Sequence, residues 1–159
     1  MEELYLALGS NKGDRMGNLN KALETMEAFV GLPAASSRIM EYPSWGFSGA
    51  DFLNSVIRFD IPQSGASPQL FLTALLKKIK EVEKALGRDG KVVFNADGSR
   101  LYSDRTIDID ILFYGSTRIE TDILTVPHPL IKERDFVMEP LADVATKKLK
   151  NTFPLYFQI

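Results

Sequence analysis

The order of apolar patterns along the chain predicts an α+β fold, in which an antiparallel sheet carries two long helices on one face. Three observations lead to this fold class. Short β-prone runs alternate with two segments of helical periodicity, in the order β-α-β-β-α-β. Turn clusters rather than a linker separate the segments, and further structure follows the last strand. This order is the ferredoxin-like arrangement, and it predicts a single domain over residues 1–159.

Composition and charge restrict the class of protein. The chain has 159 residues, of which 45% are hydrophobic and 25% charged, as in soluble globular proteins. It contains no cysteine, which excludes disulfides and thiolate metal sites. The N-terminus lacks the pattern of a secretory signal and no apolar run is long enough to span a bilayer, so we expect a cytoplasmic protein with no membrane partner. The net charge of −2 argues against a nucleic-acid partner.

The first half of the chain predicts three strands and a helix. Leu4 to Leu8 form a short apolar strand that stops at the turn residues 9–11. A helix should follow within residues 13–31, where apolar residues recur at helical spacing. Ser36 to Met40 form a weaker strand, and Phe52 to Phe59 alternate well enough to form a firm one.

The second half begins with another helix. Ser67 is a typical N-cap, Pro68 suits the first helical position, and Gly87 ends the pattern. We expect the buried stripe of this helix to consist of Leu70, Phe71, Ala74, Leu75, Ile79, Val82 and Leu86. A long polar stretch follows, and it predicts a β-hairpin over residues 91–102 around an Asp-Gly turn. Residues 126–145 predict a proline-punctuated turn that leads into a short helix.

The run RTIDIDILFYG carries the strongest functional signal. Side chains alternate faces along a strand, so Asp108 and Asp110 point to one side while Ile107, Ile109 and Ile111 face the core. This strand is the fourth of the predicted sheet, and its acidic face is the one that the two helices leave uncovered. Like charges repel and Asp is disfavoured in strands, so a divalent cation held by both carboxylates is the economical explanation. A solvated acidic face is the alternative, and Arg105 nearby favours a phosphate site.

Other polar residues are candidates to join the pair. His128 lies between two prolines, Arg134 follows it, and Arg88 directly follows the glycine that ends the second helix. Each alone is ordinarily a surface residue, but around two carboxylates they would supply donors and positive charge to phosphate oxygens. Asn54 is unfavourable inside a strand; its amide either satisfies nearby backbone groups or reads the edge of a nitrogen heterocycle. The aromatic residues that can stack on a flat ring, or simply pack, are Trp45, Phe52 and Phe136.

Taken together, these motifs resemble a known family, the 6-hydroxymethyl-7,8-dihydropterin pyrophosphokinases of folate biosynthesis. The matching parts, in order, are LALGSN, YPSWG, DFLNSV, EVEKALGR, RTIDIDILFYG and VPHPLIKERDFVMEPL. They cover nearly the whole chain. The resemblance implies a ferredoxin-like monomer that binds ATP and two Mg²⁺ ions, and whose partners are small molecules. The implied reaction transfers pyrophosphate from ATP to the hydroxymethyl group of the dihydropterin and releases AMP.

The resemblance also implies roles for individual residues. The implied metal ligands are Asp108 and Asp110, and the implied catalytic residues are these two with Arg88 and Arg105. The residues implied in ATP binding are Glu83, Arg88, Arg105, His128 and Arg134. The residues implied in pterin binding are Gly9, Pro43, Trp45, Phe52, Asn54 and Phe136.

The chain departs from the family pattern between the second helix and the aspartate strand. Family members commonly carry an arginine two residues after the position of Arg88, where this chain has Gly90, and the residues just before Arg105 also differ. Lys91 or Arg100 can replace the missing charge, although Lys and Arg contact phosphate with different geometry.

Two other function classes compete with this interpretation. A palm-like or cyclase-like metal site also places aspartates on such a sheet, but it gives Asn54 and the aromatic residues no role. A ligand-sensing or RNA-binding module would act without Mg²⁺ and without turnover, and the slight acidity argues against RNA.

Overall fold

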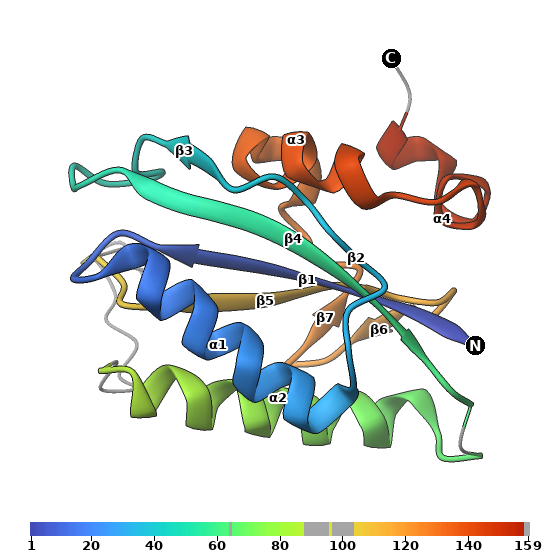
Figure 1. Ribbon diagram of the computed structural model, residues 1–159. Helices are drawn as coiled ribbons and strands as arrows, with labels where there is room; N and C mark the ends of the chain where they lie inside the picture. The colour runs from blue at the N-terminus through green and yellow to red at the C-terminus, as the bar shows by residue number, and fades with distance from the viewer. Residues whose placement is uncertain (64, 88–95, 97–103, 158–159) are drawn as a thin grey trace.

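The computed structural model describes residues 1–63, 65–87, 96 and 104–157, which form an antiparallel sheet with helices on both faces (Figure 1). The strands are β1 (Glu2–Ser10), β2 (Ala35–Ser36), β3 (Met40–Tyr42), β4 (Phe52–Ile61), β5 (Asp108–Tyr114), β6 (Ile119–Glu120) and β7 (Thr125–Val126). The helices are α1 (Arg15–Val30), α2 (Pro68–Ala85), α3 (Asp135–Val144) and α4 (Lys147–Thr152), with the short 3-10 turns η1 (Ile131–Glu133) and η2 (Pro154–Phe157).

The main sheet has the strand order β2-β4-β1-β5, and β3 pairs with the same edge of β4 as β2 does. Every pairing in it is antiparallel. The first strand of the sequence is therefore central, with β4 on one side and the aspartate strand β5 on the other. This order brings residues that are far apart in the sequence into one row across the sheet.

Helices α1 and α2 cover one face of the sheet and enclose the larger apolar core (Figure 1). Asp14 caps α1 and Ser67 caps α2, each by accepting a hydrogen bond from a backbone N–H of the first turn. The buried side chains of α2 are Leu72, Leu75, Ile79, Val82 and Glu83. The prediction that Leu70 and Ala74 belong to this buried stripe is wrong, because both are exposed and Leu72 faces the core instead.

The expected strand over residues 36–40 is divided into β2 and β3, and Ser37 explains the interruption. The Ser37 hydroxyl oxygen accepts a hydrogen bond from the backbone N–H of Val56 at 2.8 Å, while its own N–H donates to the Val56 carbonyl. A side chain thus satisfies a donor that a regular strand would pair with backbone. The chain leaves the ladder at this point and rejoins it at Met40.

Helices α3 and α4 cover part of the opposite face, over a second apolar core (Figure 1). The expectation that helices leave the acidic face of the sheet uncovered is therefore only partly right. Tyr5 and Leu112 share that face beyond the aspartates, and these large side chains are buried beneath the C-terminal helices. The open part of the face is confined to the end of the sheet that carries Asp108 and Asp110.

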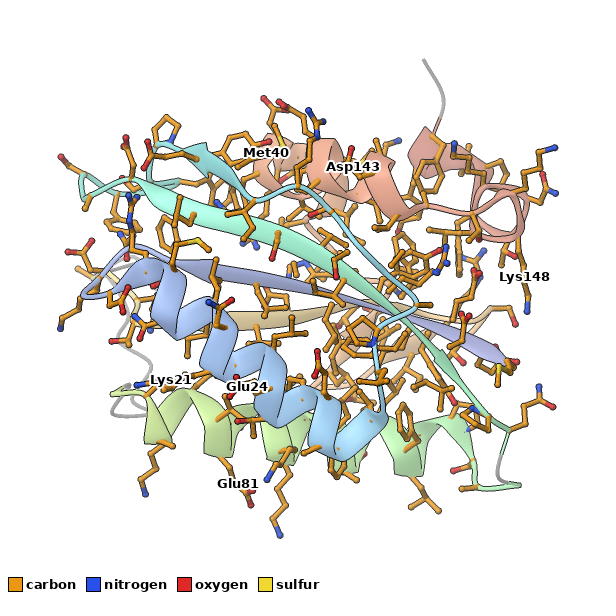
Figure 2. All side chains as sticks on the ribbon, viewed as in Figure 1. Lys21, Glu24, Met40, Glu81, Asp143 and Lys148 are labelled. Carbon is orange, nitrogen blue, oxygen red and sulfur yellow. The ribbon has the colours of Figure 1, made fainter. Side chains whose placement is uncertain are left out.

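One ion pair and one further hydrogen bond attach α3 to residues 38–42 at the edge of the sheet. Arg38 donates to both oxygens of Asp143, at 3.0 and 3.2 Å, and the Tyr42 hydroxyl donates to Glu139 at 3.1 Å. Met40 of β3 and Asp143 of α3 lie on the same side of the molecule, whereas Glu81 of α2 projects away from the sheet on the other side (Figure 2). These contacts hold the middle and the end of α3, whose first turn contributes Phe136 to the functional site.

The predicted hairpin over residues 91–102 falls outside the described residues, apart from Ala96. None of the helices in the described part of the chain is long and apolar enough to cross a membrane.

Candidate active site

The floor of the candidate site is a row of residues across three strands. Gly9 of β1 is paired with Asn54 of β4 on one side and with Asp108 of β5 on the other. In the next row of this face, Ala7 lies beside Asp110. Because the central strand contributes only a hydrogen atom and a methyl group here, the space between the amide and the carboxylates stays open.

A cavity of about 260 Å³ lies above this floor. All the predicted pterin-binding residues line it. Both predicted metal ligands also line it, and so do three of the predicted ATP-binding residues. The predicted residues lining the cavity are Gly9, Pro43, Trp45, Phe52, Asn54, Arg105, Asp108, Asp110, His128, Arg134 and Phe136. Sequence positions from 9 to 136 thus converge on one small-molecule-sized site.

The carboxylate pair faces cationic side chains. Arg134 places Nη1 at 3.6 Å from Asp110 Oδ2, and His128 places Nε2 at 3.9 Å from Asp110 Oδ1. These contacts are longer than direct hydrogen bonds, so the groups lie close without being fully engaged with one another. Within the described ranges no cluster of three or more His, Cys, Asp or Glu side chains is arranged as a metal site. Two carboxylates suit a cation such as Mg²⁺ that keeps waters or phosphate oxygens as its remaining ligands.

The orientation of His128 is set by the backbone around it. The His128 N–H donates to the Leu112 carbonyl of β5 at 3.0 Å, which ties this loop to the aspartate strand. Nδ1 accepts a hydrogen bond from the Leu130 N–H at 3.2 Å. In the neutral ring the proton is therefore on Nε2, the atom that faces Asp110.

Arg134 is buried between aromatic rings at the start of α3. Only 7% of the residue is exposed, and its guanidinium carbon lies 4.7 Å from the centre of the Trp45 ring and 5.4 Å from that of Phe136. Such stacking stabilises the cation and holds its plane in one orientation. Its Nε has no hydrogen-bond partner among the described residues. A buried donor in that state is available to an anionic ligand.

Asn54 provides a second buried donor without a partner. The residue is 6% exposed, and its Nδ2 has no hydrogen-bond acceptor within the described part of the chain. Leaving an amide donor unpaired in the protein interior costs about 1–3 kcal/mol, which suggests that a ligand normally accepts from it. Gly9 makes room for this side chain, since a Cβ at that position would lie 2.7 Å from Asn54 Oδ1.

Aromatic rings line the cavity together with Asn54. Phe52 lies next to it on β4 and contacts Phe47 edge-on, with ring centres 6.4 Å apart. Phe136 contacts Trp45 at the same centre-to-centre distance on the α3 side. The cavity thus combines one amide donor with flat apolar walls, a combination that suits a planar heterocycle.

One predicted site residue that the structure describes, Glu83, does not line the cavity. Glu83 lies on α2, beneath the sheet, where its Oε2 accepts a hydrogen bond from the Ile109 N–H at 3.1 Å. It thereby satisfies a backbone donor of β5 between the two aspartates, on the edge of the strand that faces away from β1. Arg88 lies outside the described residues, as do Lys91 and Arg100.

Sequence reasoning missed several residues of the cavity. Ala7 shares its strand face with Gly9, so the two-residue period would have found it. Pro129 and Leu130 follow His128 directly and enter the lining with it. Phe47 gave no sequence signal beyond its place in an aromatic loop.

Comparison with known proteins agrees with this geometry. A family model described as 7,8-dihydro-6-hydroxymethylpterin-pyrophosphokinase (HPPK) matches residues 5–146. The chain is 40% identical over 147 residues to the 2-amino-4-hydroxy-6-hydroxymethyldihydropteridine pyrophosphokinase of Porphyromonas gingivalis, covering 91% of this chain and 92% of that protein. The Aquifex aeolicus protein of the same name is 39% identical over 145 residues, covering 91% of this chain and 81% of its own length.

Longer proteins also contain a matching segment. The mitochondrial folate synthesis bifunctional protein of Pisum sativum is 42% identical over 144 residues, covering 90% of this chain, which spans only 25% of the pea protein. Among solved structures, an HPPK-DHPS determined in complex with substrates superposes with a TM-score of 0.66 at 14% identity, over 98% of this chain and 43% of that one. That structural similarity concerns the fold alone. The family model and the two bacterial relatives show the family to which the chain belongs. This chain belongs to the 7,8-dihydro-6-hydroxymethylpterin-pyrophosphokinase family.

Proposed function

We propose that this protein transfers pyrophosphate from ATP to the hydroxymethyl group of 6-hydroxymethyl-7,8-dihydropterin, releasing AMP, in folate biosynthesis. Family membership and the names of the bacterial relatives support the reaction. One structural observation carries the proposal further: a single cavity joins the buried, unpartnered Asn54 amide to the carboxylate pair on β5. A metal site that binds only a nucleotide would need the carboxylate pair but not the Asn54 amide.

The carboxylates of Asp108 and Asp110 are the proposed ligands of magnesium, with two ions as the proposed number. Their fit rests on the donor set, because carboxylate oxygens on one strand face leave the other coordination positions to water and phosphate. Bound magnesium would neutralise triphosphate charge and polarise the phosphorus that is attacked.

The proposed triphosphate contacts come from the cationic side chains around the carboxylates. Arg105 and Arg134 line the cavity near the aspartates, and the Nε2 proton of His128 points the same way. We retain Arg88 as a proposed catalytic residue and Glu83 as a proposed nucleotide-side residue. Arginines are suited to this task because a planar guanidinium donates to two phosphate oxygens at once.

Pterin recognition is proposed to depend on Asn54 and the rings beside it. The amide would donate from Nδ2 and accept at Oδ1 along the edge of the heterocycle. Phe52 and Phe136 would lie against its two faces. The proposed remaining contacts come from Gly9, Pro43 and Trp45, which lie along the cavity wall.

The chain's own residues would promote transfer by position and charge. The hydroxymethyl oxygen attacks the β-phosphorus, the bond from that phosphorus to the oxygen bridging to the α-phosphorus breaks, and AMP leaves while the hydroxyl proton passes to solvent. Arg105 and Arg134 would stabilise negative charge on the transferred group, as preorganised donors do in phosphoryl transfer. Closure of the cavity around both substrates would exclude water from the phosphorus.

We further propose a single, monomeric, cytoplasmic domain with the ferredoxin-like arrangement. The antiparallel order β2-β4-β1-β5, with α1 and α2 on one face, supports that arrangement when β2 and β3 are taken as one interrupted strand.

Replacement of the aspartates tests the site. Asp108→Ala and Asp110→Ala should each lower the rate of AMP formation by about 100-fold or more, because each removes a proposed ligand of the magnesium that would compensate negative charge in the transition state. Asp122→Ala is the matched control, since this aspartate is exposed in the β6–β7 turn. Near-normal turnover in a folded Asp108 or Asp110 variant would contradict the proposed metal site.

A further inference from the structure

Asn11 is a buried polar residue that lies at the end of β1 and outside the cavity lining. It is 4% exposed, and no role for it follows from the motifs or from the proposed reaction. Its backbone and side chain instead contact two segments that each contribute to the cavity. These segments are the loop between β3 and β4, residues 43–51, and the residues that lead into β5.

Asn11 fixes the backbone of Arg105. The Arg105 N–H donates to Asn11 Oδ1 at 2.6 Å, and the Asn11 N–H donates to the Arg105 carbonyl at 3.0 Å. This two-way pairing holds the Arg105 peptide against the end of the central strand. Arg105, which lines the cavity three residues before Asp108, is therefore held by its backbone.

The other half of the same amide holds the loop. Asn11 Nδ2 donates to the Ala50 carbonyl at 3.0 Å and to Asp104 Oδ1 at 2.8 Å. The packing between loop and Asp104 is tight, because a Cβ on Gly49 would lie 2.5 Å from that same carboxylate oxygen. A single amide thus accepts from the segment that leads into β5, and it donates both to that segment, at Asp104, and to the loop, at Ala50.

We propose that Asn11 is a positioning residue that couples the pterin-side loop to the phosphate-side arginine. The proposal rests on the proposed function above. The loop carries Pro43, Trp45 and Phe47 into the cavity, while Arg105 enters from the segment before β5. If the Asn11 amide joins them, ordering of either side by its substrate favours the bound arrangement of the other. The two substrates then bind with a positive coupling that passes through this residue.

Asn11→Asp separates this role from simple space filling. Aspartate has nearly the same shape and still accepts from the Arg105 N–H, but it cannot donate to the Ala50 carbonyl, and it brings a second negative charge to Asp104. Asn20→Asp is the matched control, because it makes the same chemical change on the exposed face of α1.

The quantity to measure is the pterin dissociation constant without and with an unreactive ATP analogue in the presence of Mg²⁺. Emission from Trp45, the sole tryptophan, reports on the loop directly. In the wild type and in Asn20→Asp, the analogue should tighten pterin binding by a factor in the usual range of about 5–150. In Asn11→Asp the ratio should fall close to one and kcat should drop by about 100-fold, whereas pterin affinity without nucleotide should change far less.

Restoration provides a second test. In the double variant Asn11→Asp with Asp104→Asn, the introduced amide can donate to the introduced carboxylate, but the donor to the Ala50 carbonyl stays missing, so the coupling ratio and kcat should return in part. If Asn11→Asp does not fold, Asp104→Ala is the alternative, because Asp104 is exposed. This substitution removes the contact between Asn11 and Asp104 and should lower the coupling ratio in part.

Several results would overturn the inference. A folded Asn11→Asp with wild-type coupling and kcat would do so, and so would an equal loss of pterin affinity with and without nucleotide, which indicates a merely structural role. AMP formation by the wild type is measured first: if none occurs, the proposed function fails and this inference fails with it, whereas active wild type with unaffected Asn11→Asp refutes the coupling alone.

Discussion

Replacement of Gly9 by alanine perturbs the proposed pterin contact without removing any polar group. Gly9 lies between Asn54 and Asp108 on the central strand, and its φ is not in the left-handed region, so the backbone accepts alanine. The added Cβ would lie 2.7 Å from Asn54 Oδ1 and 3.4 Å from a carbon of the Phe52 ring. The substitution therefore acts on the amide rather than on the strand.

The size of the effect follows from that distance. Asn54 Oδ1 must retreat by about 0.7 Å to reach ordinary contact at 3.4 Å, and such a shift carries a hydrogen bond beyond its useful range of roughly 3.2 Å. A mispaired buried amide costs about 1–3 kcal/mol, which is about 5- to 150-fold in affinity for the pterin. The free energy of unfolding should change by less than about 1 kcal/mol, because alanine also restricts the unfolded chain.

Calorimetric titration with the dihydropterin measures the loss, and titration with an ATP analogue is the internal control, since the atoms nearest the new Cβ belong to Asn54 and Phe52. A double-mutant cycle makes the assay sharper. Once Asn54→Ala has removed the amide, Gly9→Ala should have little further effect. Wild-type pterin affinity in Gly9→Ala, or full additivity with Asn54→Ala, would refute the reasoning.

Three further outcomes follow from contacts elsewhere in the structure. Arg134→Lys should lower kcat/KM by about 10-fold or more and change Trp45 emission, because lysine lacks the planar group that stacks there. Glu83→Ala should lower the free energy of unfolding by about 1–3 kcal/mol by leaving the Ile109 N–H without its acceptor, whereas Glu83→Gln should change it far less. Asp143→Asn should be less stable than the wild type at neutral pH, because hydrogen bonds from an arginine lower the pKa of Asp143 in the folded state. That stabilisation is present above the ordinary carboxyl pKa of 3.8 and is lost as the pH falls through the lowered folded value.

Steady-state kinetics measure the effect of Arg134→Lys. Urea unfolding at neutral pH measures the Glu83 variants, and urea unfolding over a pH series measures Asp143→Asn. Wild-type kinetics in Arg134→Lys would argue against stacking as the source of its orientation. Equal stability of the Glu83 alanine and glutamine variants would argue against the Ile109 contact. A stability difference for Asp143→Asn that persists in strong acid would contradict the assigned pKa shift.

The parts of the site that could be predicted from sequence are those governed by short periods. Alternation along a strand placed Asp108 and Asp110 on one face and buried Ile107, Ile109 and Ile111 on the other, as the structure has them. Capping chemistry placed the start of α2 at Ser67. Helix phase was harder to predict where apolar residues are dense. The first half of α2 is apolar on several sides, so its pattern did not distinguish Leu72 from Leu70.

The rest of the site depends on contacts between distant segments. Asn11 looks like a turn residue in the sequence, and its partners lie 39, 93 and 94 positions away. The partial cover of the acidic face by α3 and α4 likewise depends on where the C-terminal segment packs, and local sequence periodicity does not determine this. The Ser37 hydroxyl that interrupts the edge strand acts on Val56 across the ladder. Local pattern therefore predicted the chemistry, and tertiary contacts determined how its parts are held.

The most direct test of the proposed reaction is phosphorus NMR of the protein mixed with ATP, Mg²⁺ and 6-hydroxymethyl-7,8-dihydropterin. Attack at the β-phosphorus predicts AMP and a pyrophosphorylated pterin in equal amounts, formed only when both magnesium and pterin are present. Formation of ADP with a monophosphorylated pterin would show attack at the γ-phosphorus instead. That result, or the absence of any product while both substrates bind, would contradict the function that we assign to this cavity.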